Sequence, residues 1–213
     1  IAKARDIIFH IDAAQSTGKL LIDTQVLEAD LISSCAHKIY GPKGVGTLYV
    51  RRKAGFTLPA QIHGGGHERG MRSGTLATHQ IVAMGEALSI AQENMTIEQT
   101  EILRLKHLFL GCLGEDVNFN INGDVNQSVS GILNLSFPGK DGQILLSALP
   151  GLAISSGSAC TSATMSPSHV LAAMGLSDEA ALGSLRFSFG RFTSEVEVRS
   201  AAETLRAVLI KMA

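Results

Sequence analysis

The sequence predicts an α/β protein in two parts, on the basis of three observations. Short apolar runs rich in β-branched residues recur along the chain, stretches with helical periodicity separate them, and turns rich in Gly and Pro punctuate both. Alternation of this kind is typical of layered α/β folds. The chain has 213 residues, 45% of them hydrophobic, which is enough to bury a core. We place a boundary near residue 95, giving domains at 1–95 and 96–213.

The first domain is predicted to contain three strands and one long helical stretch. The strands are expected at residues 7–11, 31–35 and 46–50. The first of these is a continuous apolar run, which suits a buried strand of a parallel sheet. Residues 54–75 are predicted to be a Gly-rich loop. Helical periodicity follows over 77–115, and we expect it to be interrupted near Asn94.

The second domain is predicted to alternate between strands and helices. Its strands are expected at residues 131–137, 152–156 and 184–189. A helix over 141–149 should end at the following Pro-Gly pair. Ser166 followed by Pro167 predicts a helix start, as N-cap and first helical residue. Thr193 or Ser194 should cap a last helix that has glutamates in its first turn.

Composition excludes several classes of function. The formal net charge is −1, so neither a nucleic acid nor a membrane is expected as the main partner. Three cysteines in unrelated contexts predict a reducing, cytoplasmic compartment, and none has the spacing of a metal site. The chain opens without Met or a signal-peptide pattern, almost directly on an apolar run. We therefore expect a piece of a longer protein, with a separate N-terminal portion.

Two polar residues follow predicted strands, where ligands of α/β sheets bind. Asp12 could pair with a cationic ring nitrogen, although a carboxylate there could equally cap the turn that follows. Lys38 comes shortly after the second strand, where partial burial would favour its neutral, nucleophilic amine. His37 and the hydroxyl or thiol groups before it could contact a phosphate. The alternative for Lys38 is an ordinary exposed lysine at a strand exit.

Five segments together are similar to one enzyme family. They are residues 12–15, 33–44, 63–75, 155–162 and 185–191. In this order they resemble the C-terminal half of the cysteine desulfurases of the NifS/IscS type, which are class V aminotransferases of fold type I. The resemblance implies that residues 1–95 belong to the large domain that binds pyridoxal 5'-phosphate, with a mixed, mostly parallel sheet. Residues 96–213 would be the smaller C-terminal α/β domain that carries the cysteine loop.

The resemblance also implies roles for individual residues. Lys38 would bind the cofactor covalently and shuttle protons, and Cys160 would attack the substrate sulfur and carry it as a persulfide. Arg186 would hold the substrate carboxylate. The further cofactor contacts would come from Asp12 to the pyridinium nitrogen, Gln15 to the phenolic oxygen, Cys35 and His37 to the phosphate, and Thr75 to the phosphate of a neighbouring subunit's cofactor.

The implied activity removes sulfur from L-cysteine to give L-alanine and an enzyme persulfide for iron–sulfur cluster and thio-cofactor assembly. The resemblance further implies a homodimer whose partners are iron–sulfur scaffold or sulfur-carrier proteins. Two alternatives stay open. The chain could be an incomplete fragment that acts at most as a dimerising or partner-binding module, or the enzyme could be a selenocysteine lyase.

The chain departs from the family pattern at one phosphate-binding position. Cys35 stands where relatives carry serine, and a thiol is the weaker hydrogen-bond donor. Phosphate affinity should fall unless Ser34 compensates. The family's N-terminal portion, with its ring-stacking histidine and phosphate loop, and its C-terminal tail are also not matched. Small residues flank Cys160, which favours an accessible loop, although free cysteines are more often buried.

Overall fold

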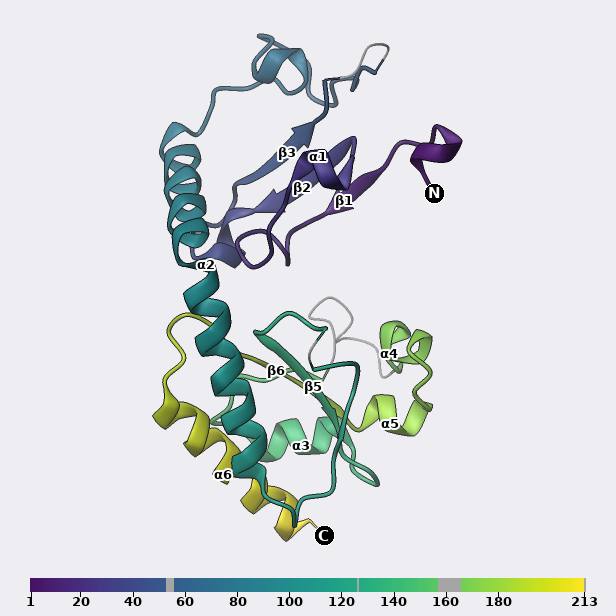
Figure 1. Ribbon diagram of the computed structural model, residues 1–213, viewed down its shortest axis with the longest axis vertical. Helices are drawn as coiled ribbons and strands as arrows, with labels where there is room; N and C mark the ends of the chain where they lie inside the picture. The colour runs from purple at the N-terminus through teal and green to yellow at the C-terminus, as the bar shows by residue number, and fades with distance from the viewer. Residues whose placement is uncertain (53–55, 126, 157–165, 213) are drawn as a thin grey trace. The chain divides into compact units, whose positions relative to one another are not determined.

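The computed structural model describes residues 1–52, 56–125, 127–156 and 166–212. The chain divides into two compact units, Ile1–Met95 and Thr96–Ala213 (Figure 1). The first unit contains strands β1 to β3 and the second contains β4 to β6.

A mixed three-stranded sheet forms the centre of the first unit. Its strands are β1 (His10–Asp12), β2 (Leu31–Cys35) and β3 (Gly46–Val50), in the order β1-β2-β3. β1 and β2 are parallel, and Asp12 lies opposite Ser33. β2 and β3 are antiparallel, because the connection between them is too short for a crossover. The predicted second and third strands thus have the bounds expected from the sequence.

The first strand is shorter than predicted. Ile7, Ile8 and Phe9 precede β1 and are 55%, 60% and 40% exposed, so the expectation of a buried strand over 7–11 is wrong for its first half. The reason is the register: β2 begins at Leu31, opposite His10, and no described strand continues alongside residues 7 and 8. Hydrophobicity alone did not reveal where the neighbouring strand begins.

Besides the sheet, the first unit contains short helices and a small core. The helices are η1 (Lys3–Arg5), α1 (Thr24–Leu27), η2 (Ala36–Ile39) and η3 (Glu68–Gly70). Asp23 caps α1 by accepting hydrogen bonds from two backbone N–H groups. The core beside the sheet consists of buried Ala13, Ala29 and Ile32, with Ile11, Ile22 and Tyr49 partly buried against them.

One long helix, α2 (Thr78–Leu113), spans the boundary between the units. The interruption predicted near Asn94 is wrong, because the Asn94 side chain donates to the Ile90 carbonyl at 2.8 Å and is satisfied within the helix. The buried residues of α2 are Met84, Ala87 and Ala91 in the first unit and Leu105, Lys106, Phe109 and Leu113 in the second.

The second unit contains an antiparallel sheet with one apolar face. Its strands are β4 (Asn120–Ile121), β5 (Ile132–Ser136) and β6 (Ser184–Ser188). The register places Leu133 opposite Phe187 and Leu135 opposite Leu185, and all four side chains are buried. The strand predicted over 152–156 is not formed as such. It is reduced to an isolated bridge, in which Ser155 pairs with β6.

Four shorter helices accompany this sheet. They are α3 (Gly142–Ala148), α4 (His169–Ala173), α5 (Asp178–Leu182) and α6 (Glu195–Lys211). The helix start predicted at Ser166 is wrong, because the backbone is still extended at Ser168, which is the N-cap of α4. Of the two candidate caps for α6, Ser194 is the N-cap and forms a capping box with Glu197.

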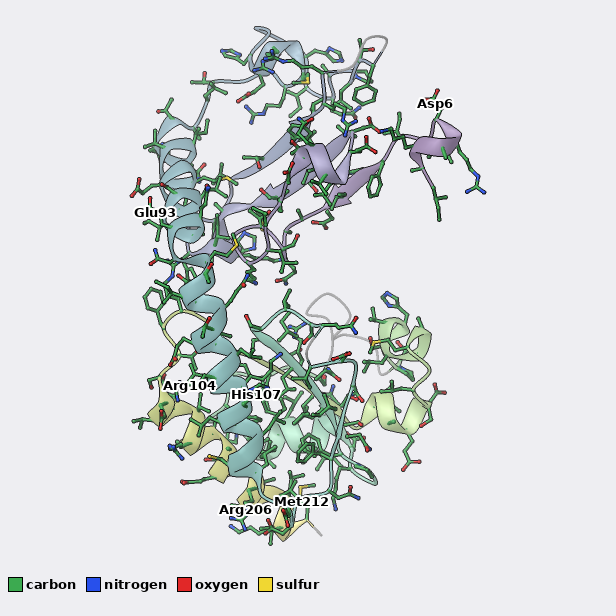
Figure 2. All side chains as sticks on the ribbon, viewed as in Figure 1. Asp6, Glu93, Arg104, His107, Arg206 and Met212 are labelled. Carbon is green, nitrogen blue, oxygen red and sulfur yellow. The ribbon has the colours of Figure 1, made fainter. Side chains whose placement is uncertain are left out.

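The helices α2, α3 and α6 bury the apolar face of β5 and β6. Phe109 of α2 lies 4.9 Å, between ring centroids, from Phe187 of β6. At the surface, the Arg104 guanidinium links α2 to α6 by donating to Glu101 and Glu195 at 2.8 and 2.9 Å (Figure 2). Among the described residues, no helix combines the length and the apolar composition needed to cross a membrane.

Candidate active site

The chemistry-bearing residues of the first unit gather at one edge of its sheet. Asp12 ends β1 and Cys35 ends β2. Because these strands are parallel, their carboxyl ends meet at the same edge, where open α/β sheets bind ligands. Lys38 follows three residues later, within η2. The arrangement brings a carboxylate, a thiol and an amine to one end of two adjacent strands.

The structure shows one of the two roles considered for Asp12, and leaves the other open. Its Oδ1 atom accepts a hydrogen bond from the Ala14 N–H at 2.9 Å, so the carboxylate does cap the turn that follows. Within the ranges that the structure describes, Oδ2 has no hydrogen-bond partner. The turn therefore orients the carboxylate without using both oxygens, and a cationic ligand nitrogen can still pair with it.

Lys38 is carried by a short helix that is anchored on both sides. Ala36 and Ile39 of η2 are buried, whereas Lys38 is half-buried and His37 is exposed. Gly41 then passes so close to α2 that an added Cβ would lie 3.1 Å from the Cβ atom of Ala87. This close contact fixes the short helix at the end of β2.

Cys35 and His37 lie together, as a phosphate site would require, but Ser34 does not join them. The Cys35 Sγ atom lies 4.0 Å from His37 Nε2. Successive side chains of a strand alternate between faces, so Ser34 points away from Cys35. Its hydroxyl is hydrogen-bonded to Thr47 Oγ1 of β3 at 2.8 Å. The structure thus gives no support to the idea that Ser34 replaces the missing serine hydroxyl.

Lys19 is a site residue that the sequence interpretation missed. Its Nζ atom donates to Gln15 Oε1 at 3.2 Å, and it lies within the electrostatic reach of Lys38 and Cys35. Burial lowers the pKa of the Lys19 ammonium, the charge of Lys38 lowers it further, and Cys35 acts in the opposite direction. The spacing of four residues between Gln15 and Lys19 could have indicated the contact, because it brings both side chains to one side of a helical turn.

Thr75 lies in the loop that follows η3 and is exposed. The described hydrogen bonds do not connect it to Lys38 or its neighbours. The loop itself is ordered by internal contacts. His67 Nδ1 accepts from the Gly74 N–H at 3.3 Å, and Ile62 pairs with Arg72.

Arg186 belongs to the second unit, on the polar side of β6. It pairs with Asn134 of β5, and its backbone exchanges hydrogen bonds with Ser155. In the part of the chain that the structure describes, its guanidinium makes no hydrogen bond or ion pair, so it can bind a carboxylate bidentately. Cys160 follows Ser155 by five positions in the sequence and lies outside the described residues.

The side chains at the sheet edge offer several different contacts to a ligand. An amine can condense with an aldehyde, a carboxylate can pair with a protonated ring nitrogen, and a thiol beside an imidazole can donate to an anionic oxygen. An amide at Gln15 adds a donor for a further ring oxygen. Together they fit an aromatic aldehyde that carries a ring nitrogen and a phosphate.

Comparisons with known proteins identify the family of this chain. Residues 1–200 match the aminotransferase class-V family. The chain is 56% identical over 212 residues to cysteine desulfurase IscS of Photobacterium profundum, covering 100% of this chain and 52% of that protein. It is 57% identical over 206 residues to cysteine desulfurase IscS of Shewanella sediminis, covering 96% and 51%. The chain thus spans about half the length of the curated relatives it matches.

Solved structures give the same result. A NifS-like protein superposes with a TM-score of 0.85 at 32% identity, covering 98% of this chain and 54% of that one. DndA from Streptomyces lividans superposes with a TM-score of 0.71 at 37% identity, covering 89% and 54%. These likenesses confirm the α/β fold expected from the sequence, that of the NifS-like fold-type I enzymes. From its sequence match and its fold, this chain belongs to the class-V aminotransferase family.

Proposed function

We propose that this chain forms the lysine-bearing part of a cysteine desulfurase that uses pyridoxal 5'-phosphate. The observation that carries the proposal is the convergence of Asp12, Cys35 and Lys38 at the carboxyl ends of two adjacent parallel strands. The matched relatives named cysteine desulfurase support it. Because the chain spans about half of those relatives, the activity is proposed for the whole protein to which it belongs.

Each residue of the edge has a role toward the cofactor. Lys38 would hold the aldehyde carbon and afterwards return a proton to the substrate. Asp12 would keep the ring nitrogen protonated through Oδ2, and Gln15 would donate to the ring oxygen. Cys35 and His37 would contribute to the phosphate shell, with Thr75 serving the cofactor of a second subunit. When bound, the cofactor supplies an electron-accepting ring.

Arg186 and Cys160 would act on the substrate. Arg186 would orient L-cysteine through its carboxylate. The thiolate of Cys160 would attack the substrate sulfur, forming an S–S bond while the substrate C–S bond breaks. The electron pair of the broken bond stays with the substrate β-carbon, which takes up a proton. The products are L-alanine and a persulfide on Cys160, so every atom of L-cysteine and the thiol is accounted for.

The persulfide would pass to an iron–sulfur scaffold or sulfur-carrier protein, in a cytoplasmic homodimer. The support is chemical. A persulfide needs an acceptor, and a role for Thr75 toward a second cofactor needs a second subunit. The described cysteines, Cys35 and Cys112, are free thiols, as a reducing compartment would leave them.

The test is reductive labelling. The chain would be co-expressed with the part of Photobacterium profundum IscS that lies outside the matched region, loaded with pyridoxal 5'-phosphate, reduced with borohydride and mapped by mass spectrometry. We expect the label on Lys38. Lys38→Ala should abolish it, whereas Lys43→Met, which changes an exposed lysine five positions on, should leave it unchanged.

The same preparation tests the reaction. We expect it to release alanine from L-cysteine and to lose this activity on Cys160→Ala while keeping the Lys38 label. A label found mainly on Lys43, or turnover that survives Cys160→Ala, would contradict the proposal.

A further inference from the structure

Lys19 is held against the segment that carries Lys38. The turn after β1 contains Gly18 in a left-handed conformation with φ +72°. An added Cβ at Gly18 would lie 2.8 Å from Ile39 Cγ2 and 3.0 Å from the Cβ of Ala91. Only glycine allows this approach, so the turn packs directly on η2 and α2. Lys19, the next residue, is thereby placed beside the end of β2.

The contact between Lys19 and Gln15 determines which way the Gln15 amide faces. An ammonium group has donors only, so the atom of Gln15 that faces it must be the carbonyl oxygen Oε1. The Nε2 donors of the same amide are then directed away from Lys19. If the Gln15 amide were flipped, its Nε2 donors would face the donors of the Lys19 ammonium and no hydrogen bond could form between them.

The surroundings of Lys19 strengthen this orientation. Lys19 is half-buried, and Lys38 of η2 and Cys35 of β2 are among the charged or titratable groups that act on its ammonium. Ile39 and Ala91, the side chains against which the turn packs, are apolar and hold the turn in place.

We propose that Lys19 is a positioning residue of the cofactor site, which holds Gln15 Oε1 so that the Gln15 Nε2 group is presented to an acceptor oxygen on the ring of the cofactor. The inference rests on the function proposed above. It explains how the Gln15 amide is oriented before the cofactor binds. A ring oxygen that carries negative charge requires a donor, and only one of the two amide orientations supplies it. Lys19 would thus act through Gln15 and not on the cofactor directly.

The test is a double-mutant cycle on cofactor affinity in the co-expressed preparation. Lys19→Met should raise the dissociation constant of pyridoxal 5'-phosphate about fivefold, which is the effect of losing one net hydrogen bond. It should also shift the visible absorption of the bound cofactor. In the Gln15→Ala background, Lys19→Met should change the dissociation constant less than about twofold, because the residue it orients is gone. Lys19→Arg, which keeps a donor, should restore affinity, and Lys43→Met is the matched control.

A readout without the cofactor separates this inference from the proposed function. In the 213-residue chain alone, the side-chain amide resonances of Gln15 should move in the NMR spectrum of Lys19→Met and stay in place in Lys43→Met. An equal loss of affinity in both backgrounds, or unmoved Gln15 resonances, would overturn the role of Lys19 while the proposed function stands. Failure of the unsubstituted preparation to bind pyridoxal 5'-phosphate would overturn the proposed function, and this inference with it.

Discussion

The two units of the chain differ in how their side chains are used. The second unit has a large continuous core, to which α2, α3, α6, β5 and β6 all contribute. The first unit has a core of small residues around Ile32 and leaves large apolar side chains such as Ile8 and Leu21 exposed at 60% and 83%. The cluster of Asp12, Cys35 and Lys38 nevertheless lies in the first unit. The large core and the proposed cofactor contacts therefore lie in different parts of the chain, although Arg186 and Cys160, which would act on the substrate, belong to the second unit.

The comparison teaches how a thinly packed unit can still hold reactive groups in place. In the first unit, precise positions come from close backbone approaches and short hydrogen bonds. Gly18 and Gly41 pack without side chains against η2 and α2, and Asp12 is held by a turn. In the second unit, position follows from burial itself, as at Leu135 and Leu205, which are 0% exposed. Substitutions in the two units should therefore fail in different ways.

The largest expected effect tests the difference between the cores directly. Leu135→Ala should lower the free energy of unfolding by about 4–5 kcal/mol, because its cavity opens inside a rigid core. Ile32→Ala removes a side chain of equal size, but the larger side chains packed on Ile32 are only partly buried, which should limit the loss to about 2 kcal/mol. Urea unfolding of the two variants measures both losses of unfolding free energy. Leu21→Ala, at an exposed position, should stay within about 0.5 kcal/mol, and equal losses at Leu135 and Ile32 would break the comparison.

A smaller effect in the second unit would show that its helices also depend on local caps. Ser194→Ala should destabilise by about 1 kcal/mol, because the capping box with Glu197 is lost at the start of α6. Ser200→Ala is the control on the same helix. Among the described residues, the Ser200 hydroxyl makes no hydrogen bond, and the Thr204 hydroxyl donates to the Ser200 backbone carbonyl, which alanine keeps. Thermal unfolding gives both values. A loss at Ser200 as large as that at Ser194 would show that the cap is not responsible.

In the first unit, the matching test concerns ligand affinity and not stability. Cys35→Ser should tighten binding of pyridoxal 5'-phosphate in the co-expressed preparation by about 1 kcal/mol, or about fivefold, because a hydroxyl donates better than a thiol. Cofactor titration followed by absorbance measures the change. Ser34→Ala should leave the affinity unchanged, since the Ser34 hydroxyl is bonded to Thr47 on the other face. An unchanged affinity in Cys35→Ser would mean that other groups already serve the phosphate.

The smallest effect is a pH dependence in the second unit. Lys106 is buried, and its Nζ atom donates to Ser128 Oγ and to the Val129 and Ile132 carbonyls at 3.2, 3.4 and 3.3 Å. Burial lowers the pKa of its ammonium below the ordinary value of 10.5. Between the lowered pKa and 10.5, the unfolded chain binds more protons than the folded one, so stability rises with pH across this window.

The measurement is the difference in unfolding free energy between the unsubstituted chain and Lys106→Met. This difference should be constant at pH values below the lowered pKa and should shift in favour of the unsubstituted chain as the pH approaches 10.5. The other lysines titrate in both proteins, so their contributions cancel in the difference between the two unfolding free energies. A difference that does not change up to this pH would show that Lys106 is not held in a dry environment.

Local sequence patterns were sufficient wherever the structure depends on neighbours along the chain. β2 and β3 have the bounds expected from their β-branched residues, and α3 begins after Asp141, whose carboxylate accepts from two backbone N–H groups. The serine at the start of α6 was one of two candidates from sequence, and only its hydrogen bonds distinguished it. The family was identified from its motifs in order, and the comparisons confirm it.

Tertiary structure decided whatever depends on a partner distant in the sequence. The length of β1 is set by where β2 begins beside it. The register of β2 with β3 gives Ser34 its partner, Thr47, on the face opposite to Cys35. Lys19 belongs to the site because a glycine turn packs on η2. The sequence by itself determined which groups are available, and only the packing of distant segments decided which of them meet, because such contacts depend on register and close approach.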